Sequence, residues 1–363
     1  MRPALLAIVI IVVPALSACL GPTDDPDTSP TPTPAENACT GVPAPTWPTQ
    51  DGTLHGANAY DYMVGLVCDH TGTAPMERAR VPGTPGQADG AAFLEGELQK
   101  AGWTVRRQAF NGAQYDSIMQ DKGGGYAQWW SDCAAADLNR MRGLNFINVE
   151  ARYGTGSRIV LLLAHWDSKR FADGDPDPAK QTLPVLGAND GASGVGVLLE
   201  LARAMGKEAP STAHQYRILL TDGEDGFDDC HPLAGSTFYA ESLSATERGL
   251  VHGVLLLDMV GDADAQFYRG CGTDQDLGDR IWRVAAQQDV RQFKDELGCN
   301  VVDDHTPFEE RDMKAVDVID FRRGSFPPYW HTAGDTPDKI SPDVLGSVGR
   351  VVQAVLKELP LAA

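Results

Sequence analysis

Carboxylate and imidazole side chains follow directly after several apolar stretches of the sequence, where they can act together as metal ligands or proton carriers. His165 ends RIVLLLAH at 158–165, and Asp258 ends VHGVLLLD at 251–258. The whole set is His165, Asp167, Asp190, Glu224, Asp225, Asp258 and His331. A cluster of uncompensated acids is costly unless a cation lies within it. Imidazole and carboxylate together suit Zn²⁺ with one position open for water or substrate, so the sequence predicts a zinc site.

The adjacent acids Glu224 and Asp225 end the stretch YRILLTDGED at 216–225. Neighbouring loop acids can diverge, so that one binds a metal while the other stays unligated and carries protons. The plainer alternative is a pair of solvated loop acids. A single carboxylate at a strand end is more often a turn former or a helix cap than a ligand. The functional interpretation therefore depends on several strands ending in the same way.

The elements that must position these residues alternate along the chain. An uninterrupted apolar run such as 159–164 is typical of a strand covered on both faces. We expect helices at 89–102, 192–205 and 341–359, and strands at 103–110, 145–153, 158–165, 216–225, 251–262 and 315–321. This order predicts one α/β domain, a three-layer sandwich with a mixed, mostly parallel central sheet and helices on both faces. Ligands usually bind at the carboxyl ends of such strands.

The first residues, MRPALLAIVIIVVPALSAC, read as an export signal. Leu16-Ser17-Ala18-Cys19 resembles a bacterial lipobox, which implies cleavage before Cys19 and acylation of its thiol; an ordinary secretory signal is the alternative. Residues 19–48 are rich in Pro, Thr and Asp and are expected to form an extended tether. The expected organisation is a signal peptide at 1–18, the tether at 19–48 and a single catalytic domain at 49–363. We expect a lipid-anchored protein at the periplasmic or extracellular face of the cell envelope.

Seven cysteines are present, and six remain when Cys19 is set aside. They are Cys39, Cys68, Cys133, Cys230, Cys271 and Cys299. An even number in an exported chain indicates up to three disulfides, with the pairing left open. None of them forms a CxxC pair, which argues against a thiolate zinc site.

The chain carries 30 Lys and Arg against 50 Asp and Glu, a formal net charge of −20. This charge repels phosphate backbones, so nucleic acid is not expected as a partner. A solvated acidic surface is the simplest reason for it. We expect a monomer.

Beyond these patterns, residues 81–359 resemble the zinc metallopeptidase family that contains dinuclear-zinc aminopeptidases and animal-type glutaminyl-peptide cyclotransferases (glutaminyl cyclases), and most resemble its bacterial cyclase-like members. The matching motifs, in the family's order, are VPGTPG (81–86), HWDSK (165–169), GANDGASGVGVLLELAR (187–203), DGED (222–225), LLDMVG (256–261), DDHTPF (303–308) and FPPYWHT (326–332). The resemblance implies a zinc-dependent enzyme with the aminopeptidase fold that acts on the N-termini of peptides or proteins.

The family contains two activities, and the resemblance assigns the residues differently for each. As an aminopeptidase, the chain would hold two zinc ions with residues matching His165, Asp190, Asp225, Asp258 and His331, with Glu224 as the general base. As a cyclase, it would hold one zinc ion with Asp190, Asp225 and His331. Glu224 would then move a proton from the substrate α-amine to the departing ammonia.

Several features resemble the cyclase branch. HWDSK is similar to the HYDSK of animal-type cyclases, and Asp303 stands where aminopeptidases usually have Ser. Phe326 and Trp330 match an aromatic wall that holds the glutamine side chain and excludes water. The resemblance therefore implies that Glu224, Asp303 and Asp258 are catalytic and that Trp330 and Phe326 bind substrate. Cyclisation is favoured because amine and amide already belong to one molecule.

The sequence also departs from the mammalian cyclases. The ligand is Asp225 rather than Glu, and a Trp expected shortly after it is missing, since Phe227 and His231 occupy that stretch. Because His165 and Asp258 are present, a second zinc ion remains possible, so aminopeptidase activity remains the alternative.

A zinc-free, lipid-anchored binding domain is a third interpretation, because fold alone does not fix activity. The presence of Glu224 and His331 argues against it.

Overall fold

The structure is a computed structural model that describes residues 39–46, 51–73, 75–122, 135–225 and 232–359. The predicted signal peptide and most of the predicted tether lie outside these residues, whereas residues 39–46 of the tether are described. Within them, no helix combines the length and the apolar character needed to cross a membrane.

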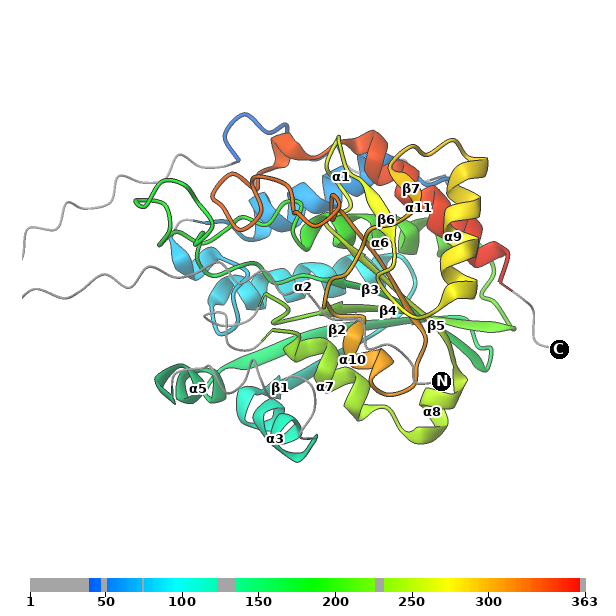
Figure 1. Ribbon diagram of the computed structural model, residues 1–363, viewed down its shortest axis with the longest axis horizontal. Helices are drawn as coiled ribbons and strands as arrows, with labels where there is room; N and C mark the ends of the chain where they lie inside the picture. The colour runs from blue at the N-terminus through cyan, green and yellow to red at the C-terminus, as the bar shows by residue number, and fades with distance from the viewer. Residues whose placement is uncertain (1–38, 47–50, 74, 123–134, 226–231, 360–363) are drawn as a thin grey trace, which may run out of the picture. The chain divides into compact units, whose positions relative to one another are not determined.

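A six-stranded mixed sheet forms the centre of the domain, in the order β1-β2-β4-β3-β5-β8 (Figure 1). The strands are β1 (Thr104–Asn111), β2 (Asn145–Tyr153), β3 (Arg158–His165), β4 (His214–Thr221), β5 (Val251–Asp258) and β8 (Ala315–Ile319). β4, β3, β5 and β8 are parallel to one another, whereas β2 is antiparallel to both β1 and β4. β3 is buried along almost its whole length, as its continuous apolar run predicts. The carboxyl ends of the four parallel strands therefore meet at one edge.

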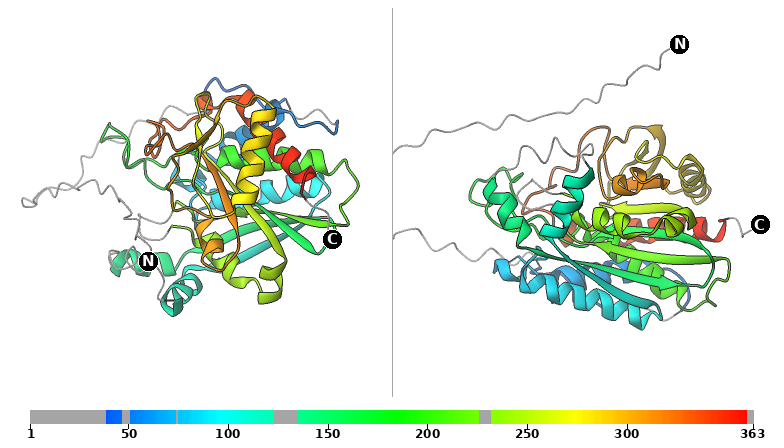
Figure 2. Two further views of the ribbon diagram at one scale, coloured as in Figure 1. Left: turned by 45° about the vertical axis from the view of Figure 1, so that its right-hand side comes forward. Right: turned by 90° about the horizontal axis from the view of Figure 1, so that it is seen from below.

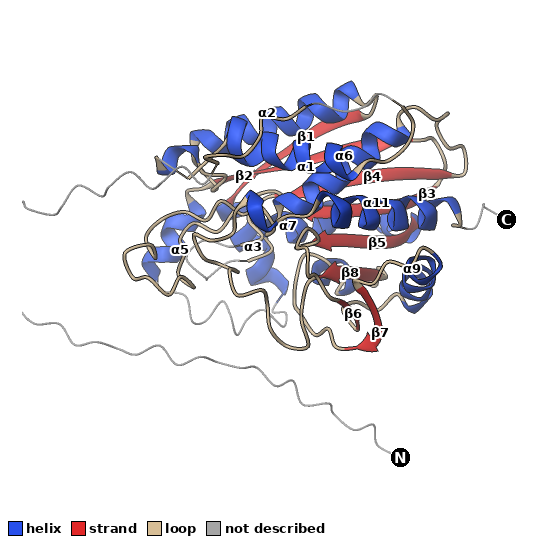
Figure 3. Cartoon of the chain, turned by 90° about the horizontal axis from the view of Figure 1, so that it is seen from above, coloured by secondary structure: helices blue, strands red, loops and turns tan. Residues whose placement is uncertain are grey.

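One face of the sheet carries the larger core. Even-numbered β3 residues such as Leu162 pack there against α1 (Gly56–Val64), α2 (Pro85–Lys100), α6 (Ala192–Met205), α9 (Gln275–Gln287) and α11 (Pro342–Lys357). Figure 3 shows α1, α6 and α11 lying across this face. α6 is buried over its entire length because α1 and α11 cover the side that the sheet does not. Its N-terminus, which follows the GAND segment, is thereby fixed against the sheet.

The opposite face packs a second, smaller core. Odd-numbered β3 residues such as Leu161 and Leu163 lie there with side chains of α7 (Ala234–Ser242) and α10 (Thr306–Glu309). α3 (Gly112–Lys122), α5 (Ala135–Arg142) and α8 (Ala245–Leu250) also belong to this side of the sheet (Figure 2). The arrangement of sheet and helices confirms the predicted three-layer α/β architecture.

The predicted strands and helices are confirmed with small shifts at their ends. Several elements were not predicted. They include the helices on the second face, α9, and a parallel pair made by β6 (Phe267–Arg269) and β7 (Phe293–Leu297). The short helical segments are η1 (Gly65–His70), η2 (Met76–Arg78) and η3 (Pro337–Lys339).

Two disulfides lie within the described residues, Cys39–Cys68 and Cys271–Cys299. The prediction of disulfide bonding is thus confirmed for four of the six cysteines. Cys133 and Cys230 lie outside the described residues. The second bridge joins the start of the loop after β6 to the segment after β7, next to Tyr268 and Ile319.

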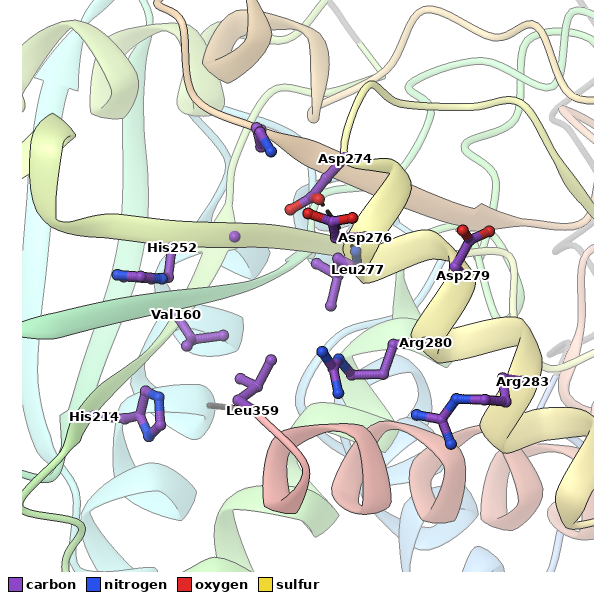
Figure 4. Close-up of a pocket in the computed structure, with 12 residues that line it drawn as sticks. Val160, His214, His252, Asp274, Asp276, Leu277, Asp279, Arg280, Arg283 and Leu359 are labelled. Carbon is purple, nitrogen blue, oxygen red and sulfur yellow. Dashed lines mark hydrogen bonds between the residues drawn. The ribbon is translucent and has the colours of Figure 1, made fainter. Parts of the chain in front are cut away.

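A cavity of about 490 Å³ opens at the amino ends of β3, β4 and β5. Figure 4 shows it between these strands, α9 and Leu359. His214, His252, Arg280 and three aspartates of the α9 region contribute to its lining. It lies at the edge of the sheet opposite the carboxyl ends that carry the predicted site, so the two are separate.

Candidate metal centre and catalytic site

The parallel strands β3 and β5 place His165 and Asp258 at the same edge of the sheet, because each is the last residue of its strand. The Nε2 atom of His165 lies 3.1 Å from Oδ1 of Asp258 and 3.0 Å from Oδ1 of Asp190. The imidazole is fully buried. Burial alone would lower its pKa, but the surrounding carboxylates, led by Asp258, raise it well above its usual value.

Asp190 belongs to the loop that leads into α6. The next residue, Gly191, has φ of +79°, and a Cβ there would lie 2.7 Å from Cε1 of His165. Glycine is therefore required for this close approach. Asp335 holds the loop from the other side, where its carboxylate accepts hydrogen bonds from the backbone N–H groups of Asn189 (2.8 Å) and Asp190 (3.0 Å).

Glu224 and Asp225 follow β4, and Asp167 fixes the backbone of both. Its Oδ1 atom accepts from the N–H of Glu224 at 3.1 Å, and its Oδ2 atom accepts from the N–H of Asp225 at 3.3 Å. Asp167 itself is fully buried two residues beyond β3. One carboxylate therefore sets the backbone positions of the predicted general base and of the predicted metal ligand.

His331 arrives from the loop after β8 and completes the group. Its Nε2 atom lies 3.1 Å from Oδ1 of Asp225 and 3.6 Å from Oδ2 of Asp190. The backbone of His331 has φ of +55°, a left-handed conformation that costs a non-glycine residue about 1 kcal/mol or more. Such strain at a residue that meets two carboxylates is typical of a functional site.

The three side chains that the sequence predicts as zinc ligands therefore converge. Asp190, Asp225 and His331 offer ligand atoms that all lie within 4.8 Å of one another. The Oδ2 atoms of Asp190 and Asp225 are buried and have no hydrogen-bond partner within the described part of the chain. Buried carboxylate oxygens without a donor call for a cation. The residues present thus fit a zinc ion with two oxygen ligands and one nitrogen ligand.

A second group of similar geometry comprises His165, Asp190 and Asp258, whose ligand atoms also lie within 4.8 Å of one another. Asp190 belongs to both groups and offers a different oxygen to each histidine. The arrangement therefore has room for either one or two ions.

The two carboxylates of the first group have different electrostatic surroundings. Burial, and next the charge of Asp225, raise the pKa of Asp190 to about 6. Burial also tends to raise the pKa of Asp225, but the hydrogen bond with His331 and the charges of His331, His165 and Lys169 together outweigh burial and lower that pKa to about 2. Asp190 therefore depends on an additional positive charge to stay ionised, whereas Asp225 is already paired.

Glu224 lies beside this group, with Oε2 3.9 Å from Nδ1 of His165. Burial raises its pKa well above the usual value; the imidazole of His165 opposes that rise, and the carboxyl of Asp303 adds to it. A carboxyl with a raised pKa can both take up and return a proton near neutral pH. Asp303 is buried in the loop before α10, and its pKa is also raised well above normal by burial and by Asp258. No hydrogen bond joins Asp303 to Glu224 within the described residues, so the two groups interact through charge.

The aromatic residues predicted to bind substrate lie against the metal group. The rings of Phe326 and Trp330 stack with centroids 4.3 Å apart, and Trp330 stacks on His331 at 3.6 Å. Both aromatic side chains pack on the cluster that contains the Cys271–Cys299 disulfide. This support places an aromatic wall directly beside a predicted metal ligand. Phe227 and His231, which replace the expected Trp, lie outside the described residues.

Several residues that hold the site were absent from the predicted set. Arg80 is buried, and its guanidinium donates to the carbonyl oxygens of Trp166, Leu186 and Gly187. It thus ties the segment after β3 to the loop before Asp190. Burial lowers the pKa of Arg80, and the nearby carboxylates of Asp167 and Asp335 oppose that lowering. An isolated Arg in ARVPG has no pattern that reveals burial, and Asp335 lies beyond the last quoted motif, whereas Asp167 stands within HWDSK and belongs to the predicted set.

With this geometry established, the chain can be compared with known proteins. Peptidase family M28 matches residues 148–356, which is more than half of the chain. The chain belongs to peptidase family M28. The matched region contains every residue of both candidate metal groups. The predicted family is therefore confirmed, and the chain is a member of an enzyme family that includes metal-dependent peptidases.

The similar proteins include a glutaminyl cyclase and a zinc-dependent exopeptidase. The bovine glutaminyl-peptide cyclotransferase-like protein is 27% identical over 317 residues, covering 78% of this chain and 73% of the relative. The solved structure of Bacteroides thetaiotaomicron glutaminyl cyclase is 28% identical, with a TM-score of 0.69 over 85% of this chain and 99% of that one. A Zn-dependent exopeptidase from Parabacteroides distasonis is 27% identical, with a TM-score of 0.68 over 84% and 99% of the two chains. Zinc thus has support from relatives as well as from the ligand set.

Proposed function

We propose that this M28 protein is a zinc-dependent glutaminyl-peptide cyclotransferase that converts N-terminal glutamine to pyroglutamate and releases ammonia. In this reaction the α-amino nitrogen forms a bond to the carbonyl carbon of the glutamine side chain. The bond from that carbon to the amide nitrogen breaks, and a proton passes from the amine to the departing ammonia. The reaction therefore needs one group that moves a proton and a site that holds the substrate folded.

The observation that carries this proposal is the stack of Phe326, Trp330 and His331 beside the metal group. A flat, apolar wall next to the reacting carbonyl suits an uncharged side-chain amide and keeps water from it. Exclusion of water matters here because water would hydrolyse the amide rather than cyclise it. Similarity to glutaminyl cyclases supports the same choice.

Asp190, Asp225 and His331 would hold the zinc ion, which as a Lewis acid polarises the side-chain carbonyl. Glu224 takes the proton from the α-amine and returns it to the leaving ammonia. The raised pKa of its largely buried carboxyl, whose side chain is 17% exposed, fits that double role. Asp167 keeps Glu224 in place through the backbone N–H, and Asp303 and Asp258 surround it with further carboxyl groups.

An aminopeptidase is the second candidate, and a specific observation favours it. His165, Asp190 and Asp258 form a second candidate ligand group that shares Asp190 with the first. Two ions at such a site would suit hydrolysis by an activated water molecule, with Glu224 as the base. The number of ions bound is therefore the chemical difference between the two proposals.

A paired product assay tests the choice. Purified protein is offered Gln-initiated peptides and Leu-initiated chromogenic amides under the same conditions, and ammonia and free amino acids are measured. Ammonia from the first substrate without free leucine from the second supports the cyclase. Free leucine without ammonia contradicts it and favours the aminopeptidase.

We also propose that the protein acts as a monomer anchored to the cell envelope through an acylated Cys19, with peptide or protein N-termini as substrates. The lipobox-like sequence and the Pro/Thr/Asp-rich tether support this proposal. Expression with radiolabelled palmitate tests it, because Cys19→Ser should abolish labelling and release the protein from membranes. Labelling that persists in this variant contradicts the anchor.

A further inference from the structure

The hydroxyl group of Tyr329 joins three of the loops that form the edge of the site. It accepts a hydrogen bond from Nδ2 of Asn189 at 3.1 Å and donates one to Oδ2 of Asp262, in the loop after β5. Tyr329 lies two residues before His331. Asn189 lies one residue before Asp190. A single phenolic oxygen thus connects the loops that carry two of the candidate zinc ligands.

Asn189 is fully buried, and each of its polar atoms has a partner. Its N–H donates to Oδ1 of Asp335 at 2.8 Å, and its carbonyl oxygen accepts from Oγ of Ser193 at 2.6 Å. Its Oδ1 atom accepts from the N–H of Gly261 at 2.9 Å. Within the described residues, Nδ2 has the hydroxyl of Tyr329 as its acceptor. Removal of that hydroxyl would leave a buried amide N–H without a partner, which is unfavourable.

Asp262 is a fixed acceptor for the other hydrogen bond of the Tyr329 hydroxyl. It is buried, and its Oδ1 atom accepts from the N–H of Asp264 at 2.6 Å and lies 3.1 Å from Nη2 of Arg322. Its Oδ2 atom meets the hydroxyl. A hydrogen bond to an ionised carboxylate is stronger than one between neutral groups, so Asp262 holds the phenolic oxygen firmly against Asn189.

The turn that contains Tyr329 also carries the aromatic wall. The carbonyl oxygen of Tyr329 accepts from the N–H of Thr332 at 3.1 Å and from its Oγ1 at 2.7 Å, and the N–H of Trp330 donates to the carbonyl oxygen of Pro327 at 2.9 Å. These bonds make one compact turn of residues 327–332. Trp330 and His331 therefore follow the position of Tyr329, because they belong to the same turn.

We propose that Tyr329 is a positioning residue whose hydroxyl fixes the turn of Trp330 and His331 against the loop of Asp190. These hydrogen bonds set the distance between the aromatic wall and the zinc ligands. They thereby set the place where the uncharged side-chain amide of an N-terminal glutamine binds. The last step rests on the proposed cyclase function, whereas the fixing of the two loops does not. Small displacements in a site can cost up to about a hundredfold in rate.

Tyr329→Phe tests the proposal, because Phe keeps the ring and removes only the hydroxyl. In zinc-loaded enzyme, kcat/KM for Gln-peptide cyclisation should fall about tenfold. Both KM and kcat should contribute to the fall, since the wall and His331 move together. A purely structural role would lower stability and leave kcat/KM of the folded enzyme unchanged.

Two further readouts do not depend on activity. Release of zinc from the loaded protein to an excess of chelator should be about tenfold faster in Tyr329→Phe, because the loops of two ligands are less firmly held together. Amide hydrogen exchange of the loaded protein, measured by mass spectrometry, should be several-fold faster in peptides covering residues 186–193 and 326–335. General destabilisation would instead increase exchange along the whole chain.

Tyr153→Phe is the matched control. The hydroxyl of Tyr153 also donates to a buried partner, the carbonyl oxygen of Glu208, at 2.5 Å. Tyr153 ends β2 and is paired with Tyr216 near the start of β4, so it lies at the edge of the sheet opposite the site. Its removal should leave kcat/KM, zinc release and exchange at 186–193 and 326–335 unchanged.

A second variant tests whether the hydroxyl acts through Asn189. Asn189→Ala removes the amide, so the double variant with Tyr329→Phe should release zinc only as fast as Asn189→Ala alone, within about twofold. Effects that multiply in the double variant would overturn the connection to the Asp190 loop. If Asn189→Ala does not fold, Asn189→Ser is judged by the same criterion.

The outcomes separate the claims. Zinc release and exchange that equal those of the wild type in Tyr329→Phe overturn the positioning role. Faster release and exchange with unchanged kcat/KM overturn the link to the substrate. If wild-type protein cyclises no Gln-peptide, the proposed function fails, and zinc release and exchange still decide whether the hydroxyl fixes the two loops.

Discussion

The Nε2 atom of His331 lies 3.1 Å from Oδ1 of Asp225 and joins the loop after β8 to the loop after β4. These loops follow strands that are not neighbours in the sheet, since β3 and β5 lie between them. The contact therefore spans the edge of the sheet above β3, where His165 and the loop of Asp190 are found.

Removal of a ligand should remove the metal. Asp225→Asn is expected to lower the bound zinc, measured by elemental analysis after dialysis, to less than about a tenth of an equivalent per chain, because one of three protein ligands is lost. Asp177→Asn is the control; Asp177 is exposed and its carboxylate accepts from the N–H of Ala179 in a surface turn. Full zinc content in Asp225→Asn would show that the metal lies elsewhere.

Glu224→Gln should separate binding from chemistry. Gln cannot accept and return a proton, so kcat should fall by about a thousandfold. The zinc content should stay at the wild-type value, because Glu224 is not among the three ligands of the first group. Elemental analysis and steady-state kinetics on the same preparation measure both. Substantial turnover by this variant would remove Glu224 from the mechanism.

The aromatic wall should affect substrate affinity as well as chemistry. Trp330→Ala removes a ring that stacks on both Phe326 and His331, and kcat/KM for Gln-peptides should fall by about 10–100-fold, mostly through KM. Trp330→Phe keeps an aromatic face and should recover most of the loss. Equal activity in the Ala and wild-type proteins would mean that substrate binds away from this wall.

The pH dependence of stability should reveal a buried ion pair distant from the site. Burial alone would raise the pKa of Glu150, but Arg152 and Arg106 outweigh it and lower the pKa below its usual value. A carboxylate with a lowered folded-state pKa stabilises the protein above its unfolded pKa and loses that contribution as the pH falls. Glu150→Gln should cost about 2 kcal/mol at pH 7, and urea denaturation should show the difference shrinking below about pH 4.5. A difference that is constant with pH would contradict the ion pair.

Much of the fold was accessible from the sequence because the parallel strands and their covering helices are strongly patterned. Ile159–Ala164 is apolar throughout since β3 is covered on both faces, and α6 occupies the predicted residues 192–205. α9 was missed although Leu277, Ile281 and Val284 follow helical spacing. The pair β6–β7 is short and has no clear alternation, so only tertiary packing defines it.

The candidate site was predicted in part for the same reason. His165 and Asp258 end patterned strands, so their proximity follows from parallel topology. The position of His331 does not follow from any period, because a loop with a left-handed residue delivers it. Its residue type placed it in the predicted set, and the family resemblance assigned it as a zinc ligand. Arg80 and Asp317 were missed because charged residue types give no sign of burial in the sequence, although both side chains are buried.

The product formed from a Gln-initiated peptide tests the central claim most directly. Zinc-loaded protein is incubated with the peptide, and the product is analysed by mass spectrometry. We predict a peptide of unchanged length that has lost one molecule of ammonia and is no longer formed by Glu224→Gln. A peptide shortened by its first residue, together with free glutamine, would contradict the account.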